Sequence, residues 1–303
     1  MKLQRFFCAV LAVLSLGVTG CNWIGGKGEA DTSTSLPDPP LTEDSESQSK
    51  TEVVPMKKAY HILFIGNSYT YYNEMPTAIF ESLAERAGYD LTVDSITNGG
   101  HKLSEFTNPT DSYGAKVEQA LTGSKKYDFV ILQEQSVRPA TENPSDFYSA
   151  VRNLTKRIRE TGATPILYAT WGRKSGNSTL GTYGWTNESM TWRLAAGYQA
   201  IGDELDISVA HVGLAFYDVY TGQSDIELYH SDGSHPSYIG SYLAAVTLFA
   251  RMFHTDPTEV SYTGGLTLAN ANVVREAARK AVFDTPSIPA EYQTSSVGIG
   301  LSY

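Results

Sequence analysis

The sequence predicts an α/β protein in which helices cover both faces of a parallel β-sheet. Short apolar runs of strand length alternate with longer helical patterns between residues 61 and 283. The clearest runs are apolar throughout, as expected for strands that are buried on both faces of a parallel sheet. Polar clusters follow several of these runs. Because the carboxyl ends of parallel strands meet at one edge, where ligands bind, we expect these clusters to form one site.

Five segments have the character of strands. The run His-Ile-Leu-Phe-Ile begins the series, and Asp-Phe-Val-Ile-Leu is its third member. The tripeptide Asn-Gly-Gly, a turn signal, closes the second run. We expect strands at 61–65, 91–96, 128–132, 165–170 and 207–212.

Helical patterns separate these runs. Pro76 lies near the start of the first pattern and Gly88 just after its end, while Gly162 ends the second; these residues favour such boundaries. We expect helices at 76–87, 146–161, 192–205, 236–253 and 269–283. Residues 172–190 instead combine glycines with aromatic residues, which indicates either a plain long loop or one wall of a sugar-binding cleft.

The N-terminus has the pattern of an export signal. Lys2 and Arg5 precede a mostly apolar stretch over 6–18, which is too short for a stable membrane span. The triplet Val-Thr-Gly then precedes Cys21 and resembles the bacterial lipobox, whose cysteine becomes the lipidated N-terminus of the mature protein. We therefore expect a signal peptide over 1–20 and an exported protein that Cys21 anchors to the bacterial membrane through lipid. The alternative is an ordinary secretory signal with an incidental cysteine.

Composition divides the rest of the chain in two. Residues 21–56 are rich in Gly, Ser, Thr, Pro and acidic residues, which favours a disordered tether, and 57–303 suits one catalytic domain of ordinary size. Cys8 and Cys21 are the only cysteines, so we expect no disulfide in the mature fold and no metal site built on cysteine. The net charge of −10 argues against nucleic acid as a partner.

Two distant motifs carry the chemistry. Ser68 follows the first expected strand at the start of a helix, where a serine hydroxyl is exposed. Asp232 lies three residues before His235, and this spacing lets the carboxylate hold the imidazole while its other nitrogen takes a proton from a serine. The motifs predict a Ser-His-Asp hydrolase. The alternatives are that Ser68 only caps the helix and that His235 is a surface histidine. We see no convincing metal-ligand spacing and expect no cofactor.

Together the motifs resemble the SGNH (GDSL-like) hydrolase superfamily. Gly-Asn-Ser at 66–68 corresponds to its Gly-Asp-Ser block, Asn-Gly-Gly at 98–100 to its Asn-x-Gly block, and the segment 232–235 to its Asp-x-x-His block. The resemblance implies a three-layer α/β/α, flavodoxin-like fold with Ser68 as the nucleophile. It also implies an oxyanion hole that includes the backbone N–H groups of Ser68 and Gly100.

One block departs from the pattern of the superfamily. Its third block contains an Asn, but this chain has Gln-Glu-Gln-Ser at 133–136. We expect Gln135 to supply the missing side-chain amide to the oxyanion hole, with Gln133 as the alternative because both would lie on one face of a strand. Glu134 would point the other way and make a structural hydrogen bond.

Other polar residues near the motifs have structural interpretations. Asn67 is expected to fix its turn through local backbone hydrogen bonds. His101 and His230 lie close to the site blocks without a required role. His61 and His211 are expected to be hydrogen-bonded core residues within strands.

The motifs and the resemblance indicate an exported serine esterase tethered to the membrane. By analogy with the superfamily, the substrate is expected to be an ester, and the reaction the removal of acetyl groups from a carbohydrate or glycan. Two alternatives stay open. One is a surface glycan-binding lipoprotein without useful turnover, which the missing Asn would explain. The other is a lipase or thioesterase, which requires an apolar groove for an acyl chain.

Overall fold

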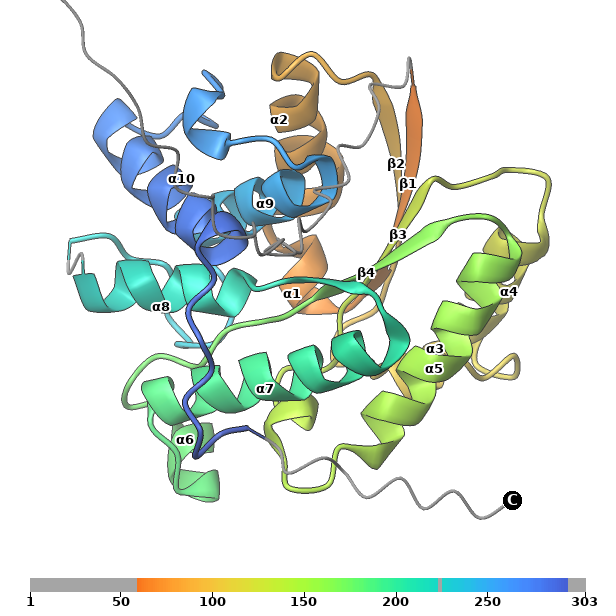
Figure 1. Ribbon diagram of the computed structural model, residues 1–303, viewed down its shortest axis with the longest axis horizontal. Coiled ribbons are helices and arrows are strands. Elements are labelled where there is room, and N and C mark those ends of the chain that lie inside the picture. Colours follow the sequence, from red (N-terminus) through yellow and green to blue (C-terminus); the bar gives the residue numbers. More distant parts are fainter. Residues whose placement is uncertain (1–58, 223–224, 294–303) are drawn as a thin grey trace, which may run out of the picture. The chain divides into compact units, whose positions relative to one another are not determined.

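The structure, a computed structural model, describes residues 59–222 and 225–293. Five strands form one parallel sheet in the order β2-β1-β3-β4-β5, with helices on both faces (Figure 1). This arrangement confirms the predicted three-layer α/β/α, flavodoxin-like fold. The strands are β1 (Tyr60–Gly66), β2 (Leu91–Thr97), β3 (Phe129–Leu132), β4 (Thr164–Tyr168) and β5 (Ser208–Ala210). The expected signal peptide, Cys21 and the tether over 21–56 lie outside the described residues.

The helices alternate with these strands along the chain. Short 3₁₀ turns cover Tyr72–Glu74, Arg138–Ala140 and Pro257–Glu259, and Met75–Phe80 forms a π-helical segment. The α-helices are α1 (Ser68–Tyr71), α2 (Glu81–Arg86), α3 (Leu103–Phe106), α4 (Ser112–Thr122), α5 (Ser145–Glu160), α6 (Ser178–Tyr183), α7 (Asn187–Leu205), α8 (Val212–Gly222), α9 (Tyr238–Phe253) and α10 (Leu268–Phe283).

Three predicted boundaries need correction. The helix expected over 76–87 is a π-helical segment followed by α2. The start of α7 is Asn187 rather than residue 192, because Thr186 caps the helix by accepting a hydrogen bond from the backbone of Ser189. The strand expected over 207–212 ends at Ala210, and α8 begins two residues later.

Four helices were not predicted, namely α3, α4, α6 and α8. In α4 the buried side is small, consisting of Gly114, Val117 and Leu121. Gly114 packs so closely on the preceding loop that a Cβ would lie 1.9 Å from the carbonyl oxygen of Asn108. A glycine that serves this contact weakens the helical pattern in the sequence.

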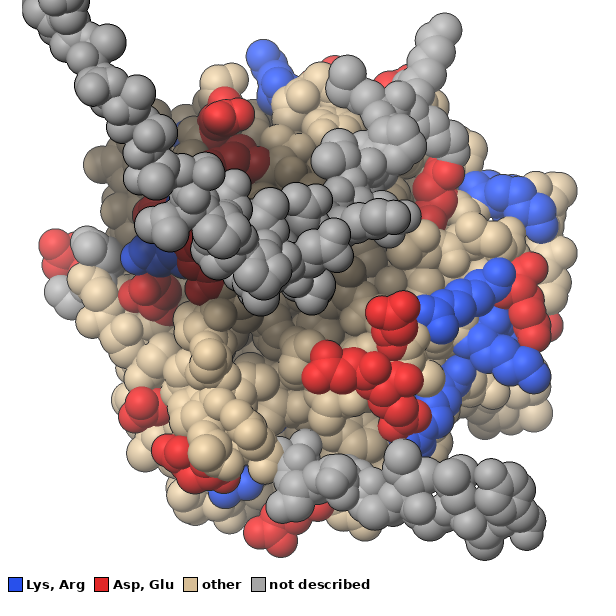
Figure 2. Space-filling view, viewed as in Figure 1, with Lys and Arg blue, Asp and Glu red and all other residues tan. Residues whose placement is uncertain are grey.

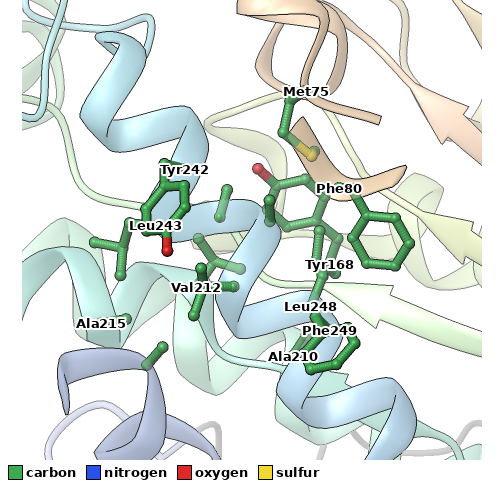
Figure 3. Close-up of a cluster of buried hydrophobic side chains, with 14 of the residues drawn as sticks. Met75, Phe80, Tyr168, Ala210, Val212, Ala215, Tyr242, Leu243, Leu248 and Phe249 are labelled. Atoms are coloured by element: carbon green, nitrogen blue, oxygen red, sulfur yellow. The ribbon is translucent and has the colours of Figure 1, made fainter. Parts of the chain in front are cut away.

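Each face of the sheet buries its own hydrophobic cluster. Successive residues of β1 alternate between them: Phe64 joins the cluster under α2, α8, α9 and α10, whereas Leu63 and Ile65 join the one under α3, α4, α5 and α7. Figure 3 shows part of the first cluster, which includes Tyr168 of β4 and Phe249 of α9. Both faces are therefore covered, which explains why the strands read as continuous apolar runs.

Ion pairs join the helices on the outside of the second cluster. Arg157 of α5 contacts Glu118 of α4 at 2.5 Å, and Arg152 of α5 contacts Glu204 of α7 at 2.5 Å. Figure 2 shows basic and acidic side chains mixed over this part of the surface. Among the described residues, we find no helix with the length and apolar character that crossing a membrane requires.

Candidate active site

The carboxyl ends of the central strands lie level with one another. Ile65 of β1 pairs with Ile96 of β2 and with Leu132 of β3. The polar segments that begin at Asn67, Asn98 and Gln133 therefore emerge at the same edge of the sheet. This edge is where the sequence predicted a shared site.

Ser68 is held at the tip of β1 by a tightly packed turn. Asn67 accepts a hydrogen bond from the backbone N–H of Tyr69 at 3.2 Å and caps α1. A Cβ on Gly66 would lie 2.6 Å from Oγ1 of Thr70 and 2.7 Å from Oε1 of Gln133. The close approach requires glycine before the serine, and the local bond of Asn67 agrees with the predicted structural role.

Ser68, His235 and Asp232 form a hydrogen-bonded chain. Nδ1 of His235 lies 2.5 Å from Oδ2 of Asp232, and Nε2 lies 2.8 Å from Oγ of Ser68. Partial burial opposes the ionisation of Asp232, but hydrogen bonds from His235 and from two backbone N–H groups outweigh it and lower the pKa of Asp232 to about 2. The ionised carboxylate accepts a hydrogen bond from Nδ1–H and so keeps the proton on Nδ1, which leaves Nε2 of the neutral imidazole able to accept the serine proton.

Aromatic rings hold the segments around Ser68 and His235 against each other. The Tyr69 ring stacks on Trp171 with centroids 4.6 Å apart, and its hydroxyl lies 2.7 Å from Oγ of Ser234. Nε1 of Trp171 donates to the carbonyl oxygen of Ser234 at 3.0 Å. The Tyr72 ring stacks on the imidazole of His235 at 4.4 Å. Tyr69, which follows Ser68, and Ser234, which precedes His235, thus bond each other and both contact Trp171.

A cavity of about 470 Å³ opens over this chain of hydrogen bonds. The backbone N–H groups of Ser68 and Gly100 have no acceptor among the described residues. Gly100 has a φ of +73°, a conformation that favours glycine. The lining residues are Asn67, Ser68, Tyr69, Tyr71, Tyr72, Gly99, Gly100, Gln135, Ser136, Arg173, Ser234 and His235.

The two glutamines after β3 occupy different environments. Gln135 is half-buried and lines the cavity, and its Oε1 accepts from the N–H of Val137 at 3.1 Å, which leaves its amide N–H₂ group free to donate. Gln133 is fully buried, and its Oε1 accepts from the N–H of Asn67 and the hydroxyl of Thr70, both at 2.8 Å. The expectation that both share one strand face is wrong, because β3 ends at Leu132.

Glu134 is buried beneath the site. Its carboxylate accepts from the backbone N–H of Leu103 at 3.2 Å and from that of Gln135 at 2.6 Å. Burial raises the pKa of Glu134 to about 7, although these N–H groups act in the opposite direction. Glu134 therefore joins the segment after β2 to the segment after β3, which is the structural role predicted for it.

The histidines outside the chain of hydrogen bonds have structural contacts. His101 accepts from the side chain of Asn98 at 2.8 Å, and His230 lies on the surface, 3.9 Å from Asp232. His61 lies in β1 and contacts the carbonyl oxygen of Lys126. His211 follows β5 rather than lying within a strand. Its Nε2 forms a hydrogen bond with Gln199 at 2.7 Å, but its buried Nδ1 has no partner among the described residues. The prediction of a hydrogen-bonded core histidine is therefore met for one ring nitrogen only.

The aromatic residues of the segment 172–190 do not line the cavity. Tyr183 stacks on Trp185 at 4.3 Å, and Trp185 packs against Leu180 and its neighbours. Of this segment, Arg173 alone is a lining residue, and α6 together with the start of α7 replaces the expected loop. The prediction of an aromatic sugar-binding wall in this segment is therefore wrong.

A larger cavity, of about 850 Å³, lies between α7 and residues 285–288 and includes His211. It contains none of the predicted site residues, so we locate the chemistry in the smaller cavity. Among the described residues, no three His, Cys, Asp or Glu side chains are grouped so that they could hold a metal ion.

Comparisons with known proteins support the fold and the family. No model of a protein family matches the sequence, and a comparison with curated proteins also gives no match. The chain is similar to a solved SGNH hydrolase protein from Slackia heliotrinireducens, with 35% sequence identity, coverage of 64% of this chain and 99% of that one, and a TM-score of 0.56. It is also similar to a DUF4886 family protein from Bacteroides uniformis, with 19% identity, coverage of 77% and 99%, and a TM-score of 0.63. The second likeness concerns the fold.

Proposed function

Because this chain belongs to the SGNH hydrolase family, we propose that it is a serine esterase with Ser68 as nucleophile and His235 as general base. One observation carries the proposal. The imidazole bridges Oγ of Ser68 and the carboxylate of Asp232, at 2.8 Å and 2.5 Å, beside an open cavity. This is the geometry of a Ser-His-Asp triad.

The first half of the reaction transfers the acyl group to the enzyme. Oγ of Ser68 attacks the ester carbonyl carbon, and Nε2 of His235 takes the serine proton. The negative charge that develops on the carbonyl oxygen is stabilised by the N–H groups of Ser68 and Gly100 and by the amide of Gln135. The tetrahedral intermediate then collapses, the bond to the alcohol breaks, and His235 gives its proton to the leaving oxygen.

The second half releases the acid. A water molecule gives a proton to His235 and attacks the acyl carbon, and the same donors hold the oxyanion. The intermediate then collapses, the bond between the acyl carbon and Oγ of Ser68 breaks, and the protonated imidazole returns its proton to Oγ as the acid leaves. Asp232 stays ionised throughout and stabilises the imidazolium. No step requires a cofactor.

The walls of the cavity favour a small acyl group on a polar alcohol. None of the described residues that line it is aliphatic, whereas a lipase or thioesterase needs an apolar acyl groove. Tyr71 is 40% exposed at the rim, and an exposed ring suits contact with a sugar. We infer that the enzyme removes acetyl groups from a carbohydrate or glycan.

Replacement of Ser68 tests the proposal. Ser68→Ala is expected to lower kcat for p-nitrophenyl acetate by at least about 10³-fold and to abolish labelling by a serine-directed fluorophosphonate. Ser95→Ala, on an exposed position of β2, is the matched control and should change neither. A wild-type protein that binds acetylated oligosaccharides but is neither labelled nor active would favour the glycan-binding lipoprotein instead.

The location of the enzyme is a separate proposal that rests on the sequence motif before Cys21. We infer an exported protein anchored by lipid on Cys21, with residues 21–56 as a tether. Cys21→Ser should release the protein from the membrane fraction and abolish labelling by palmitate, while kcat on a soluble ester stays within about twofold, because a flexible tether isolates the site from the anchor. An unlabelled wild type in the medium would identify a plain secretory signal.

A further inference from the structure

Arg173 is a cation in the cavity wall whose contacts are all with uncharged atoms. Nη1 donates to Oγ1 of Thr179 at 2.7 Å and lies 3.4 Å from Oδ1 of Asn177. Nη2 donates to Oγ of Ser136 at 3.0 Å, and the buried Nε has no partner among the described residues. No carboxylate within residues 59–222 and 225–293 forms an ion pair with it.

Three arginines on the surface and Lys174, the next residue in the chain, do form ion pairs with carboxylates. Arg138, Arg152 and Arg157 each lie 2.5 Å from a carboxylate on the surface. Lys174 pairs with Glu227. Arg173 therefore places a charge without a carboxylate partner in the cavity wall, although a buried charge is the one that most needs a counter-ion. The buried Arg275 also contacts only uncharged atoms, but it does not line this cavity.

The carboxylate of the catalytic site is already engaged. Oδ2 of Asp232 accepts from Nδ1 of His235, and Oδ1 accepts from the backbone N–H groups of Ser234 and His235 at 2.8 and 2.9 Å. Asp232 cannot turn toward Arg173 without releasing the general base. The charge of the cavity wall is left for a ligand to neutralise.

We propose that Arg173 binds an anionic group of the substrate, so that the preferred esters carry a carboxylate. The inference rests on the proposed esterase function and names its substrate class. A guanidinium has five N–H donors, and the second N–H on Nη2 remains available beside Ser136, which itself lines the cavity. In a protein with a net charge of −10, a cation in the cavity also offsets the repulsion of an anionic substrate.

The carboxylate can belong to either half of the ester. In the alcohol half it agrees with the inferred removal of acetyl groups, whereas in the acyl half it would replace the acetyl group by a dicarboxylic one. Paired substrates separate the two cases. For the acyl half, p-nitrophenyl hemisuccinate is compared with p-nitrophenyl butyrate. For the alcohol half, 4-acetoxybenzoate is compared with 4-acetoxybenzamide. The wild type should prefer the charged member of one pair. Arg173→Gln should lower that charged-to-neutral ratio of kcat/KM by about 10- to 100-fold, mainly through KM, because it removes a charge-assisted hydrogen bond.

Lys174→Gln is the matched control, since it removes the neighbouring positive charge from outside the cavity. It should leave the ratio within about twofold. Arg173 also ties Ser136 to the segment at Thr179, and a purely structural role predicts that Arg173→Gln slows both members of each pair equally. Equal losses, or a wild type without preference in either pair, would overturn the inference.

Binding to the Ser68→Ala protein gives a readout that does not need turnover. Calorimetry should detect binding of 4-acetoxybenzoate or succinate to the Ser68→Ala protein. Adding Arg173→Gln to this protein should weaken the binding by about 10-fold or more. If the wild type hydrolyses none of the four esters, the esterase proposal fails, whereas this binding still decides the role of Arg173. Equal binding with and without Arg173 would reject the anion site.

Discussion

The two segments that meet at the cavity beside Ser68 are built in different ways. The segment 232–235 lies at the surface, and Asp232 bonds residues two and three positions further along the chain. The segment 133–136 is mostly buried, and its side chains bond Asn67, Thr70 and Leu103, which lie 31–66 positions away. The carboxylate of Asp232 is thus fixed by contacts within its own segment, although Tyr69, Trp171 and Tyr72 pack on that segment, whereas the side chains of Gln133 and Glu134 bond distant parts of the fold.

The difference teaches where substitutions should act. In the surface segment, Asp232 and His235 belong to the proposed triad, so their replacement should change activity more than stability. In the buried segment, Gln133 and Glu134 hold backbone N–H groups that would otherwise be unsatisfied, so their replacement should change stability. Gln135 lies between these cases, since it belongs to the buried segment but faces the cavity.

The largest expected effect concerns the surface segment. Asp232→Asn should lower kcat by about 10⁴-fold, because an asparagine favours the wrong imidazole tautomer, and His235→Ala should lower it at least as much. The double variant Ser68→Ala/His235→Ala should be no slower than either single variant, since the residues act as one unit. The free energy of unfolding should change by less than about 1 kcal/mol. Multiplicative losses, measured with p-nitrophenyl acetate, would show that Ser68 and His235 do not share a mechanism.

The second prediction separates the two glutamines. Gln135→Ala should lower kcat by about 100-fold with little change in KM, because an oxyanion donor binds the transition state preferentially. Gln133→Ala should instead lower the free energy of unfolding by about 2–4 kcal/mol, since the N–H of Asn67 and the hydroxyl of Thr70 lose their acceptor. Urea unfolding and steady-state kinetics on both variants check this. The reverse assignment of effects would make Gln133 the donor.

The third prediction is a pH dependence of stability that arises from Glu134. Its pKa is about 7 in the folded protein against an ordinary value of 4.5. Between these values the unfolded chain has released the proton that the folded protein retains. The stabilisation is therefore complete below pH 4.5 and is lost as the pH rises through 7, by about 3 kcal/mol in total.

Glu134→Gln should remove this slope. Urea unfolding at pH 5 and pH 8 should show a smaller decrease in the free energy of unfolding for the variant than for the wild type. Glu85→Gln, on the exposed side of α2, is the control and should keep the wild-type slope. Parallel pH profiles for the wild type and Glu134→Gln would mean that Glu134 does not titrate in this range.

The same contrast explains what could be predicted from the sequence. The strands and the Ser68, Asp232 and His235 motifs were predictable, because apolar runs and short spacings are local properties. The different positions of Gln133 and Gln135 could not be predicted, because they depend on where β3 ends. The sequence shows no signal that would end a strand at Leu132. Arg173 belongs to the segment 172–190, for which the sequence indicated only a loop or a cleft wall. Its lack of a counter-ion depends on side chains from several separate segments.

The ring stack beneath the site has an optical consequence. Trp171 is fully buried between Tyr69 and Phe216, and its indole N–H donates to the carbonyl oxygen of Ser234, the residue before His235. Indole emission responds to hydrogen bonding and to solvent. In a protein whose Trp23, Trp185 and Trp192 are replaced by phenylalanine, the fluorescence of Trp171 would therefore report displacement of the segment that carries the general base. The molecule contains its own spectroscopic probe for the position of its proposed proton acceptor.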